Sequence, residues 1–245
     1  ISFISQSGAY GGVVFREFKK RNLGVATFVS IGNQVDTTHA DLLEYLRDDP
    51  HTGVVALFVE EIKEARRFME IASATARKKP IVAFKVGRTT SGGRAASSHT
   101  GSLAGDFAIF RSAMRQCGVV LARTTEEFID LLTLFSADPS ARPKGRNVAI
   151  LTISGGPCVA ASDACEEIGL AVPPLPSATK KKVRALIPDF GADGNPVDMT
   201  PQMDPAKFAD CIGAVGRDKA FDMAMAINVG LDRQGLQVFF LRAAG

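Results

Sequence analysis

The chain has 245 residues, of which 46% are hydrophobic and 22% charged, so it is long enough to bury one large core or two medium ones. Its formal net charge of +3 is small, and it has no Trp and two Tyr. The chain therefore has little of the positive charge and few of the aromatic rings that nucleic-acid binding requires, so we do not expect a nucleic-acid partner. No stretch approaches the roughly 18 consecutive apolar residues of a membrane span and no basic leader is visible, so we expect a cytoplasmic protein with no membrane partner.

The first half of the chain alternates short apolar runs with amphipathic segments. The runs predict strands over 1–5, 25–32, 54–60, 80–87 and 119–123. The amphipathic segments predict helices over 13–22, 39–49, 64–79, 107–118 and 125–136. Strands and helices that alternate at these lengths predict an α/β fold with a parallel, doubly wound sheet.

A stretch rich in proline and charge separates this half from the second. We expect a first domain over 1–138, a linker over 139–145 and a second domain over 146–245. In the second domain the pattern predicts a strand over 147–153, helices over 158–169 and 179–187, a helix from Ala206 and a strand over 224–230. It therefore predicts a second parallel-sheet unit in tandem, and we expect this unit to lack its final elements.

Each half opens on the same device, an apolar strand that turns through glycine into a helix. Ser7 and Gly8 begin the first helix; Ser154, Gly155 and Gly156 begin the second. Such a helix end presents free backbone N–H groups and the positive end of the helix dipole, which bind anions. Glycine turns of this kind also occur where only tight packing requires them. The presence of two copies in one chain favours the alternative, in which a phosphate is held between the two helix ends.

A histidine lies in the longest segment without a clear pattern. Residues 89–106 read TTSGGRAASSHTGSLAGD, which predicts a loop of eighteen residues that contains His99. Imidazole is a nucleophile that is largely neutral at physiological pH, so it can accept a phosphoryl group covalently. The alternative is a surface histidine in a disordered loop. His39 and His51 lie in no such constellation, and we expect them to be structural.

A phosphohistidine site needs a carboxylate that orients the imidazole. Glu60 and Glu61 follow the third predicted strand, at the sheet edge where doubly wound folds build their sites. Either could serve. Lys85 and Arg88 lie at the end of the next strand and are auxiliary candidates that would add positive charge, unless they are ordinary exposed cations.

The cysteines suggest neither a disulfide nor a metal site. No pair has the Cys-x-x-Cys spacing, and all four lie in apolar or helical surroundings: Cys117, Cys158, Cys165 and Cys211. We expect buried, reduced thiols and no metal site. The chain begins without Met, and we expect it to be cut from a longer polypeptide.

Six segments resemble one family, the NDP-forming acyl-CoA synthetases, which are relatives of succinyl-CoA synthetase. They are SQSGAYGG (5–12), SIGNQVDTTHADLLEYLRDDP (30–50), LFVEEIKEARRF (57–68), KKPIVAFKVGRTTSGGRAASSHTGSLAGD (78–106), ISGGPCVAASDACEEIGL (153–170) and GNPVD (194–198). The order KxGRT followed by AxSSHTGxLAG is more specific than any lone glycine turn. The resemblance implies two flavodoxin-like ligase domains in tandem, of the alpha type over 1–138 and of the beta type over 146–245.

The resemblance also implies the residue roles. In the family the histidine of SHTG is transiently phosphorylated, which maps onto His99. The family's glutamate in the pattern LEGI aligns with Glu60, and here Glu61 stands where glycine is usual, so either acid remains a candidate partner. The two helix starts, at Ser7–Gly8 and at Gly155–Gly156, match the paired helices that hold the phosphate.

The family reaction converts acyl-CoA, ADP and phosphate to a carboxylic acid, CoA and ATP, through an acyl phosphate and the phosphohistidine. The resemblance implies partners for this chain: a CoA-binding Rossmann domain and an ATP-grasp domain, in the same or another chain, within a homo- or hetero-oligomer. CoA and ATP or ADP with Mg²⁺ would be substrates of the complete enzyme, with no cofactor resident in this chain. The chain alone should be inactive.

Three other functions compete with this hypothesis. A regulatory module of the same fold, fused to another enzyme domain, would sense a nucleotide or acyl-CoA without turnover, and the presence of His99 disfavours it. A nicotinamide-dependent oxidoreductase fits poorly, because GAYGG is not G-x-G-x-x-G and the strand over 25–32 ends without an acid. A serine hydrolase fits poorly too, because neither Ser7 nor Ser154 has glycine two residues before it.

Overall fold

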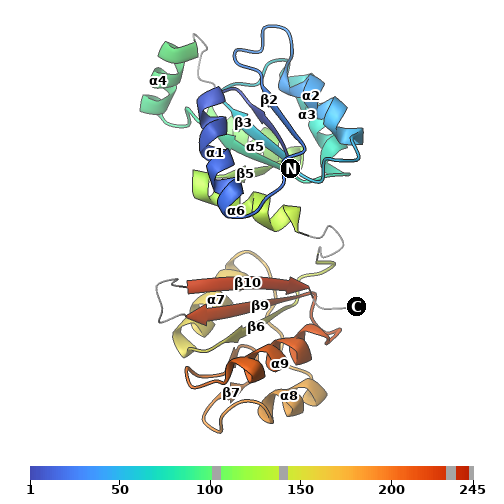
Figure 1. Ribbon diagram of the computed structural model, residues 1–245, viewed down its shortest axis with the longest axis vertical. Coiled ribbons are helices and arrows are strands. Elements are labelled where there is room, and N and C mark those ends of the chain that lie inside the picture. The colour runs from blue at the N-terminus through green and yellow to red at the C-terminus, as the bar shows by residue number, and fades with distance from the viewer. Residues whose placement is uncertain (101–105, 138–142, 230–235, 243–245) are drawn as a thin grey trace. The chain divides into compact units, whose positions relative to one another are not determined.

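The computed structural model describes residues 1–100, 106–137, 143–229 and 236–242. The chain forms two compact units, Ile1–Pro139 and Ser140–Gly245. Figure 1 shows a separate sheet with its own helices in each unit.

The first unit is built on a fully parallel sheet. Its strands are β1 (Ser2–Ser5), β2 (Thr27–Ser30), β3 (Val55–Val59), β4 (Ile81–Lys85) and β5 (Val120–Ala122), in the order β2-β1-β3-β4-β5. This order confirms the predicted flavodoxin-like α/β class. The strand order reverses between β1 and β3, and in open α/β sheets the crevice at the carboxyl ends of such strands is where ligands bind.

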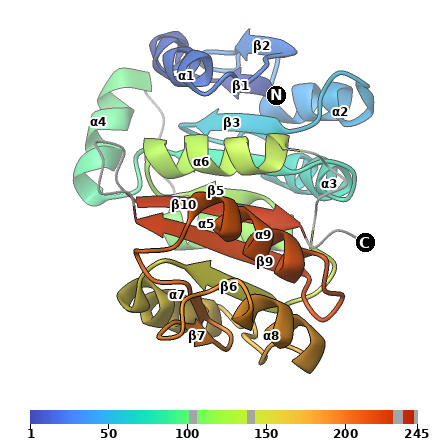
Figure 2. The same ribbon diagram turned by 60° about the horizontal axis from the view of Figure 1, so that its bottom comes forward.

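Helices cover both faces of this sheet (Figures 1 and 2). They are α1 (Gly8–Lys20) and α6 (Thr125–Ser136) on one face, and α2 (His39–Asp48), α3 (Ala65–Ala76) and α5 (Phe107–Gln116) on the other. Side chains alternate along β3, so that Val55 and Leu57 pack toward α2 and α3 while Phe58 packs toward α1. Burial on both faces explains why the central strands are continuous apolar runs.

Residues Thr90–Thr100 form a helix, α4 (Figure 1), so the prediction of a loop over 89–106 is wrong for this part of the segment. The Thr89 side chain accepts a hydrogen bond from the Gly92 N–H at 3.1 Å, which is how a residue before a helix satisfies its first turn. Ala95 and Ala96, the strongest helix formers, then outweigh the Gly92–Gly93 pair. Residues 101–105, at the end of the predicted loop, lie outside the described part of the chain.

The second unit has a mixed sheet rather than the parallel one predicted. Its strands are β6 (Val148–Thr152), β7 (Ala192–Asp193), β8 (Val197–Asp198), β9 (Met223–Val229) and β10 (Leu236–Arg242), in the order β10-β9-β6-β8-β7. β8 and β9 run parallel to β6, whereas β10 is antiparallel to β9 and β7 to β8. The antiparallel pairs arise where the connection is too short for the crossover that parallel strands need.

In the described part of this unit, three helices accompany the sheet: α7 (Gly155–Glu167), α8 (Ser177–Arg184) and α9 (Pro205–Gly216). One core cluster contains Leu151 from β6, Val183 from α8 and Cys211 from α9. All four cysteines of the chain are buried and free, as predicted. Burial raises the pKa of the Cys158 and Cys211 thiols to about 11, so neither is a ready nucleophile.

His39, predicted to be structural, is a buried neutral histidine at the start of α2. It is 1% exposed, and its Nδ1 lies 2.9 Å from Gln34 Oε1. Burial lowers its pKa from 6.5 to about 4. The His39 pKa is therefore lower in the folded than in the unfolded chain.

The stability of the first unit should therefore fall as the pH is lowered from about 6.5 toward 4, because only the unfolded state gains the His39 proton there. By pH 5 the expected loss from this residue is about 2 kcal/mol. Urea unfolding of the parent and of His39→Asn at pH 7 and pH 5 measures it, and the variant should lose less. His51→Asn, at an exposed position, is the control and should match the parent. Equal pH dependence in the parent and in His39→Asn would contradict the prediction.

Candidate functional site

The start of α1 lies at the carboxyl end of β1. Ser7 caps the helix, because its Oγ accepts a hydrogen bond from the Tyr10 N–H at 3.3 Å. The Ser5 hydroxyl bridges the turn: it accepts from Ser7 N at 3.1 Å and donates to Ser7 O at 2.7 Å. Gly8 and Ala9 are exposed, and their N–H groups belong to the first turn, which the helix itself leaves without partners. The predicted residues Ser7 and Gly8 therefore form a helix end that an anion can reach.

The glycines of this turn differ in what they do for the fold. A methyl group built on Gly11 would lie 2.6 Å from Phe28 Cζ, so a larger residue there would require the Phe28 ring to shift. A methyl group on Gly8 would lie 3.6 Å from Ser30 Oγ, which is an ordinary contact. Packing therefore accounts for Gly11 but leaves Gly8 without a structural reason, as expected if a ligand approaches the backbone at this point.

Replacing Gly8 with alanine should therefore leave stability nearly unchanged but weaken anion binding. We expect the free energy of unfolding to change by less than about 0.5 kcal/mol. The affinity of the full-length protein for inorganic phosphate should fall by about tenfold, because the methyl group obstructs the approach to the first N–H groups. Calorimetric titration with phosphate and urea unfolding measure the two effects. Gly12→Ala, one turn into α1 with open space around it, is the matched control, and equal affinities in the two variants would contradict the prediction.

Glu60 and Glu61 follow β3 at the same edge of the sheet as the start of α1. The N–H groups of both donate to Gln6 Oε1, at 2.8 and 3.0 Å. Both glutamates are partly buried. The structure thus brings the start of α1 and the backbone of both candidate acids together through Gln6, a residue that no sequence pattern singles out.

Lys85 and Arg88 are engaged with the protein rather than freely exposed. Lys85 is 9% exposed; its Nζ donates to Glu60 O at 2.6 Å and lies 5.6 Å from the centre of the Phe110 ring. Burial lowers the pKa of Lys85, and the charges of Glu60 and Glu61 oppose that shift. Arg88 donates to Arg123 O at 2.8 Å, and its guanidinium lies 5.8 Å from the ring centres of both Phe84 and Phe107.

His99 lies in α4, near the end of that helix. Because β4 is parallel to β1 and β3, its carboxyl end lies at the same sheet edge as Ser5 and Glu60. The chain continues from β4 into α4 at that edge, as Figure 1 shows. The segment that contains His99 therefore begins beside the candidate site. The His99 side chain itself lies outside the described part of the structure.

The second unit repeats the turn chemistry of the first. Thr152 Oγ1 accepts from Ser154 N at 3.0 Å and donates to Ser154 O at 3.1 Å, as the Ser5 hydroxyl does with Ser7. Ser154 precedes α7 in an extended conformation but, unlike Ser7, makes no side-chain cap. The sequence repeat therefore corresponds to a repeated hydrogen-bonded turn, one built on serine and the other on threonine.

A carboxylate accompanies the start of α7. A methyl group built on Gly155 would lie 3.2 Å from Asp198 Oδ2, so glycine allows this side chain to approach the helix end closely. Asp198 Oδ1 accepts from Thr200 N at 3.0 Å. Asp198 belongs to the segment GNPVD, and the pairing of β8 with β6 that places it beside α7 is not visible in the sequence.

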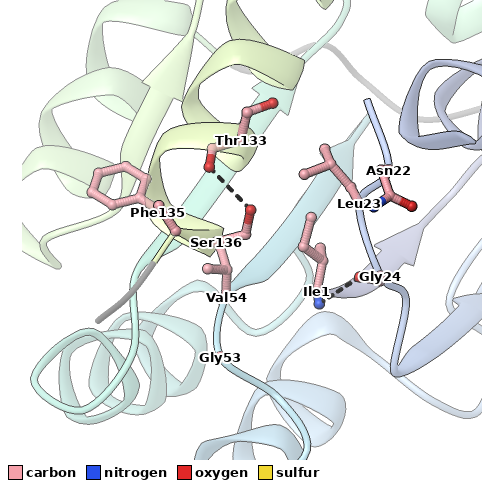
Figure 3. Close-up of a pocket in the computed structure, with 10 residues that line it drawn as sticks. Ile1, Asn22, Leu23, Gly24, Gly53, Val54, Thr133, Phe135 and Ser136 are labelled. Atoms are coloured by element: carbon pink, nitrogen blue, oxygen red, sulfur yellow. Dashed lines mark hydrogen bonds between the residues drawn. The ribbon is translucent and has the colours of Figure 1, made fainter. Parts of the chain in front are cut away.

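One hollow of the first unit lies at the opposite edge of its sheet. It encloses about 500 Å³, and its lining includes Leu23, Gly24 and Val54, at the amino ends of the strands. Figure 3 shows Ile1 in its wall, with its backbone nitrogen hydrogen-bonded to Gly24 O at 2.9 Å. None of the predicted site residues lines this hollow, so it is not the candidate site.

Within the described ranges, no three or more His, Cys, Asp or Glu side chains cluster in a way that could hold a metal ion. Over the same part of the chain, no helix combines the length and the apolar character that crossing a membrane requires.

Two family models match the chain. The succinyl-CoA ligase-like flavodoxin domain matches residues 1–135, and the Ligase-CoA domain matches residues 148–225. The alpha subunit of ADP-forming acetate–CoA ligase II from Pyrococcus furiosus is 40% identical over 230 residues, which are 94% of this chain and 50% of that protein. ADP-forming acetate–CoA ligase I from Archaeoglobus fulgidus is 37% identical over 244 residues, 100% of this chain and 34% of that protein.

A solved structure agrees with these matches. The dinucleotide-forming acetyl-coenzyme A synthetase 1 of Ca. Korarchaeum cryptofilum, in complex with phosphate and ADP, superposes with a TM-score of 0.86 at 33% identity. The superposition covers 93% of this chain and 49% of that one. The chain thus spans about half the length, or less, of the relatives it matches. With its succinyl-CoA ligase-like flavodoxin domain, it belongs to the family of NDP-forming acyl-CoA synthetases.

Proposed function

We propose that this chain is the phosphoryl-relay part of an NDP-forming acyl-CoA synthetase, which interconverts acyl-CoA, ADP and phosphate with a carboxylic acid, CoA and ATP. The observation that carries the proposal is the carboxyl edge of the first sheet. There an accessible helix end at Gly8 and the Glu60 backbone are joined by hydrogen bonds through Gln6. A dianionic phosphoryl group and an imidazole each find one of their required partners at this edge.

The relay comprises two transfers. In the first, a ring nitrogen of His99 attacks the phosphorus of an acyl phosphate; the N–P bond forms, the P–O bond to the acyl group breaks, and the carboxylate leaves. In the second, an oxygen of the ADP β-phosphate attacks the same phosphorus, and the N–P bond breaks as ATP forms. Both transfers are reversible.

Each site residue has one task in this relay. The Glu60 carboxylate accepts the N–H of the other imidazole nitrogen, which fixes the tautomer and stabilises the positive charge that develops during attack. The Glu61 carboxylate adds negative charge near the imidazole. The positive charge of buried Lys85 partly neutralises the two carboxylates. The N–H groups at Ser7 and Gly8 hold the phosphoryl oxygens.

The start of α7, at Ser154, Gly155 and Gly156, serves the same phosphoryl group from the second unit. Support for this pairing comes from the repeated turn, in which the Thr152 hydroxyl plays the part of the Ser5 hydroxyl. Asp198 lies beside this helix end, so its carboxylate offsets part of the positive potential that the phosphoryl group meets there.

The remaining parts of the enzyme belong to partners of this chain. A CoA-binding Rossmann domain and an ATP-grasp domain, in the same or another chain, supply CoA and nucleotide, and Mg²⁺ accompanies the nucleotide. The phosphate and ADP in the Ca. Korarchaeum cryptofilum structure support phosphate and nucleotide as substrates. We expect a small carboxylic acid as the third substrate, a homo- or hetero-oligomeric assembly and a cytoplasmic location.

The test is covalent labelling of this chain within the full-length, assembled protein. Incubation with γ-labelled ATP and Mg²⁺ should place label on residues 1–139 in a linkage that acid breaks and base does not. Addition of ADP should remove the label. A full-length protein that catalyses acyl-CoA formation without such a labelled intermediate would contradict the relay, and one without turnover would favour a regulatory module.

A further inference from the structure

The polar backbone groups of Glu60 and Glu61 are held by three side chains from other parts of the first unit. Gln6 accepts both N–H groups at 2.8 and 3.0 Å. Lys85 Nζ donates to Glu60 O at 2.6 Å, and Gln34 Nε2 donates to Glu61 O at 3.2 Å. We name Gln6, Gln34 and Lys85 the acid clamp, because together they bond every backbone N–H and C=O of the two candidate acids.

The clamp is buried and its amides have defined orientations. Gln6 is 8% exposed and Gln34 is 2% exposed. Gln34 Oε1 lies 3.2 Å from the His39 N–H and 2.9 Å from His39 Nδ1, so its amide nitrogen faces Glu61. Gln6 Nε2 lies 3.5 Å from Gly32 O, which leaves its oxygen for the two glutamate N–H groups. Neither amide can turn over without losing bonds on both sides.

Gln6 differs from the other two clamp residues by its place in the chain. It lies between Ser5 and Ser7, inside the turn that starts α1, so the residue that holds the acids is part of the anion-binding helix end. The Gln6 side chain therefore ties that helix end to the Glu60 backbone, in addition to the backbone pairing of β1 with β3. Phosphoryl transfer depends on the distance between such groups, because catalytic groups must be held to within about 0.5 Å.

We propose that Gln6 is a positioning residue for the relay, which acts on the reaction through Glu60. This inference rests on the proposed function, since it assigns Gln6 a task only if Glu60 orients His99. Gln6 does not touch the phosphoryl group; it fixes the backbone from which the Glu60 carboxylate reaches the imidazole. Without it, Glu60 keeps its charge, but its backbone N–H loses the side-chain bond that ties it to the start of α1.

A double-mutant cycle in the full-length protein tests this inference. The readout is the single-turnover rate constant for label appearing on His99 from γ-labelled ATP with Mg²⁺. Gln6→Met removes the acceptor at similar length and should slow labelling by about thirtyfold, and Glu60→Gln by about a hundredfold. The double variant should be labelled at a rate within about threefold of that of Glu60→Gln, because Gln6 acts through Glu60.

Effects that multiply in the double variant would overturn the inference, because a merely structural loss would act independently of Glu60. Labelling at the parent rate in Gln6→Met would overturn it as well. Gln116→Met, at an exposed position at the end of α5, is the matched control and should label like the parent. If Gln6→Met does not fold, Gln6→Asn replaces it, since asparagine stays polar but is one methylene too short to hold both N–H groups.

The design separates this inference from the proposed function. If the full-length parent turns over without label on His99, the relay itself fails. If the parent is labelled on His99 and Glu60→Gln is slow, but the Gln6 and Glu60 effects multiply, the relay stands and only the positioning role of Gln6 is lost.

Discussion

His99→Asn in the full-length protein should abolish covalent labelling from γ-labelled ATP, with less than about 1% of the parent's label remaining, because asparagine has no nucleophilic ring nitrogen. Acyl-CoA formation should fall with it, since both transfers pass through the same N–P bond. Asparagine keeps a polar side chain of similar shape near the start of the imidazole, so the fold of α4 should be preserved. Autoradiography after acid or base treatment, together with an assay of CoA-dependent ATP hydrolysis, measures the result.

The control for this variant is His51→Asn. His51 is exposed and lies between α2 and β3, before the amino end of that strand. It should label and turn over like the parent. If His99→Asn is labelled as strongly as the parent, the histidine has no part in the mechanism. If the label is instead found on Glu60 or Glu61, a carboxylate carries the phosphoryl group as an acyl phosphate in place of the histidine.

Phe3→Ala should destabilise the first unit by about 3–5 kcal/mol, the largest effect on folding that we expect from one substitution. Phe3 lies in β1 and is 0% exposed. Its ring centre lies 6.4 Å from that of Phe15, 5.5 Å from that of Phe28 and 6.1 Å from that of Phe128. Truncation therefore leaves a cavity where α1, β2 and α6 meet the strand, and this packed surrounding cannot collapse into it.

Urea unfolding measures the effect of Phe3→Ala, with the slope of the transition checked against the parent. Phe190→Ala in the second unit makes the same chemical change at a side chain that is 69% exposed, and it should cost less than about 0.5 kcal/mol. A loss of less than about 1 kcal/mol in Phe3→Ala would show that this aromatic cluster repacks around the gap.

The strands and helices of the first unit were predictable because each long element has a clear period. β3 is buried along its whole length, and its sequence is an unbroken apolar run. An amphipathic helix of the same length would include polar residues on its exposed face, so the run indicates a strand. In the second unit, β7 and β8 have two residues each, too few for any period to appear, and their pairing depends on contacts distant in sequence. The helical state of α4 was missed because glycine pairs usually break helices, whereas here Thr89 supplies the start.

For the candidate site, residues that act through the local backbone were predictable and those that act across the sheet were not. Ser7 and Gly8 follow from the strand–turn–helix pattern alone. The bond from Glu60 N to Gln6 Oε1 joins residues 54 positions apart, and it exists only because β1 and β3 are neighbours in the sheet. Asp198 was hidden in the same way, since its place beside Gly155 depends on β8 pairing with β6.

The aspartate next to Gly155 weakens the attraction of the second repeated turn for an anion. A unit of negative charge within a few ångströms of a helix end offsets much of the partial positive charge that such an end carries, which is about half an elementary charge. A dianion bound at the start of α7 would therefore be held less firmly than that helix end alone would hold it, and replacing Asp198 would change the grip of this turn without altering its backbone.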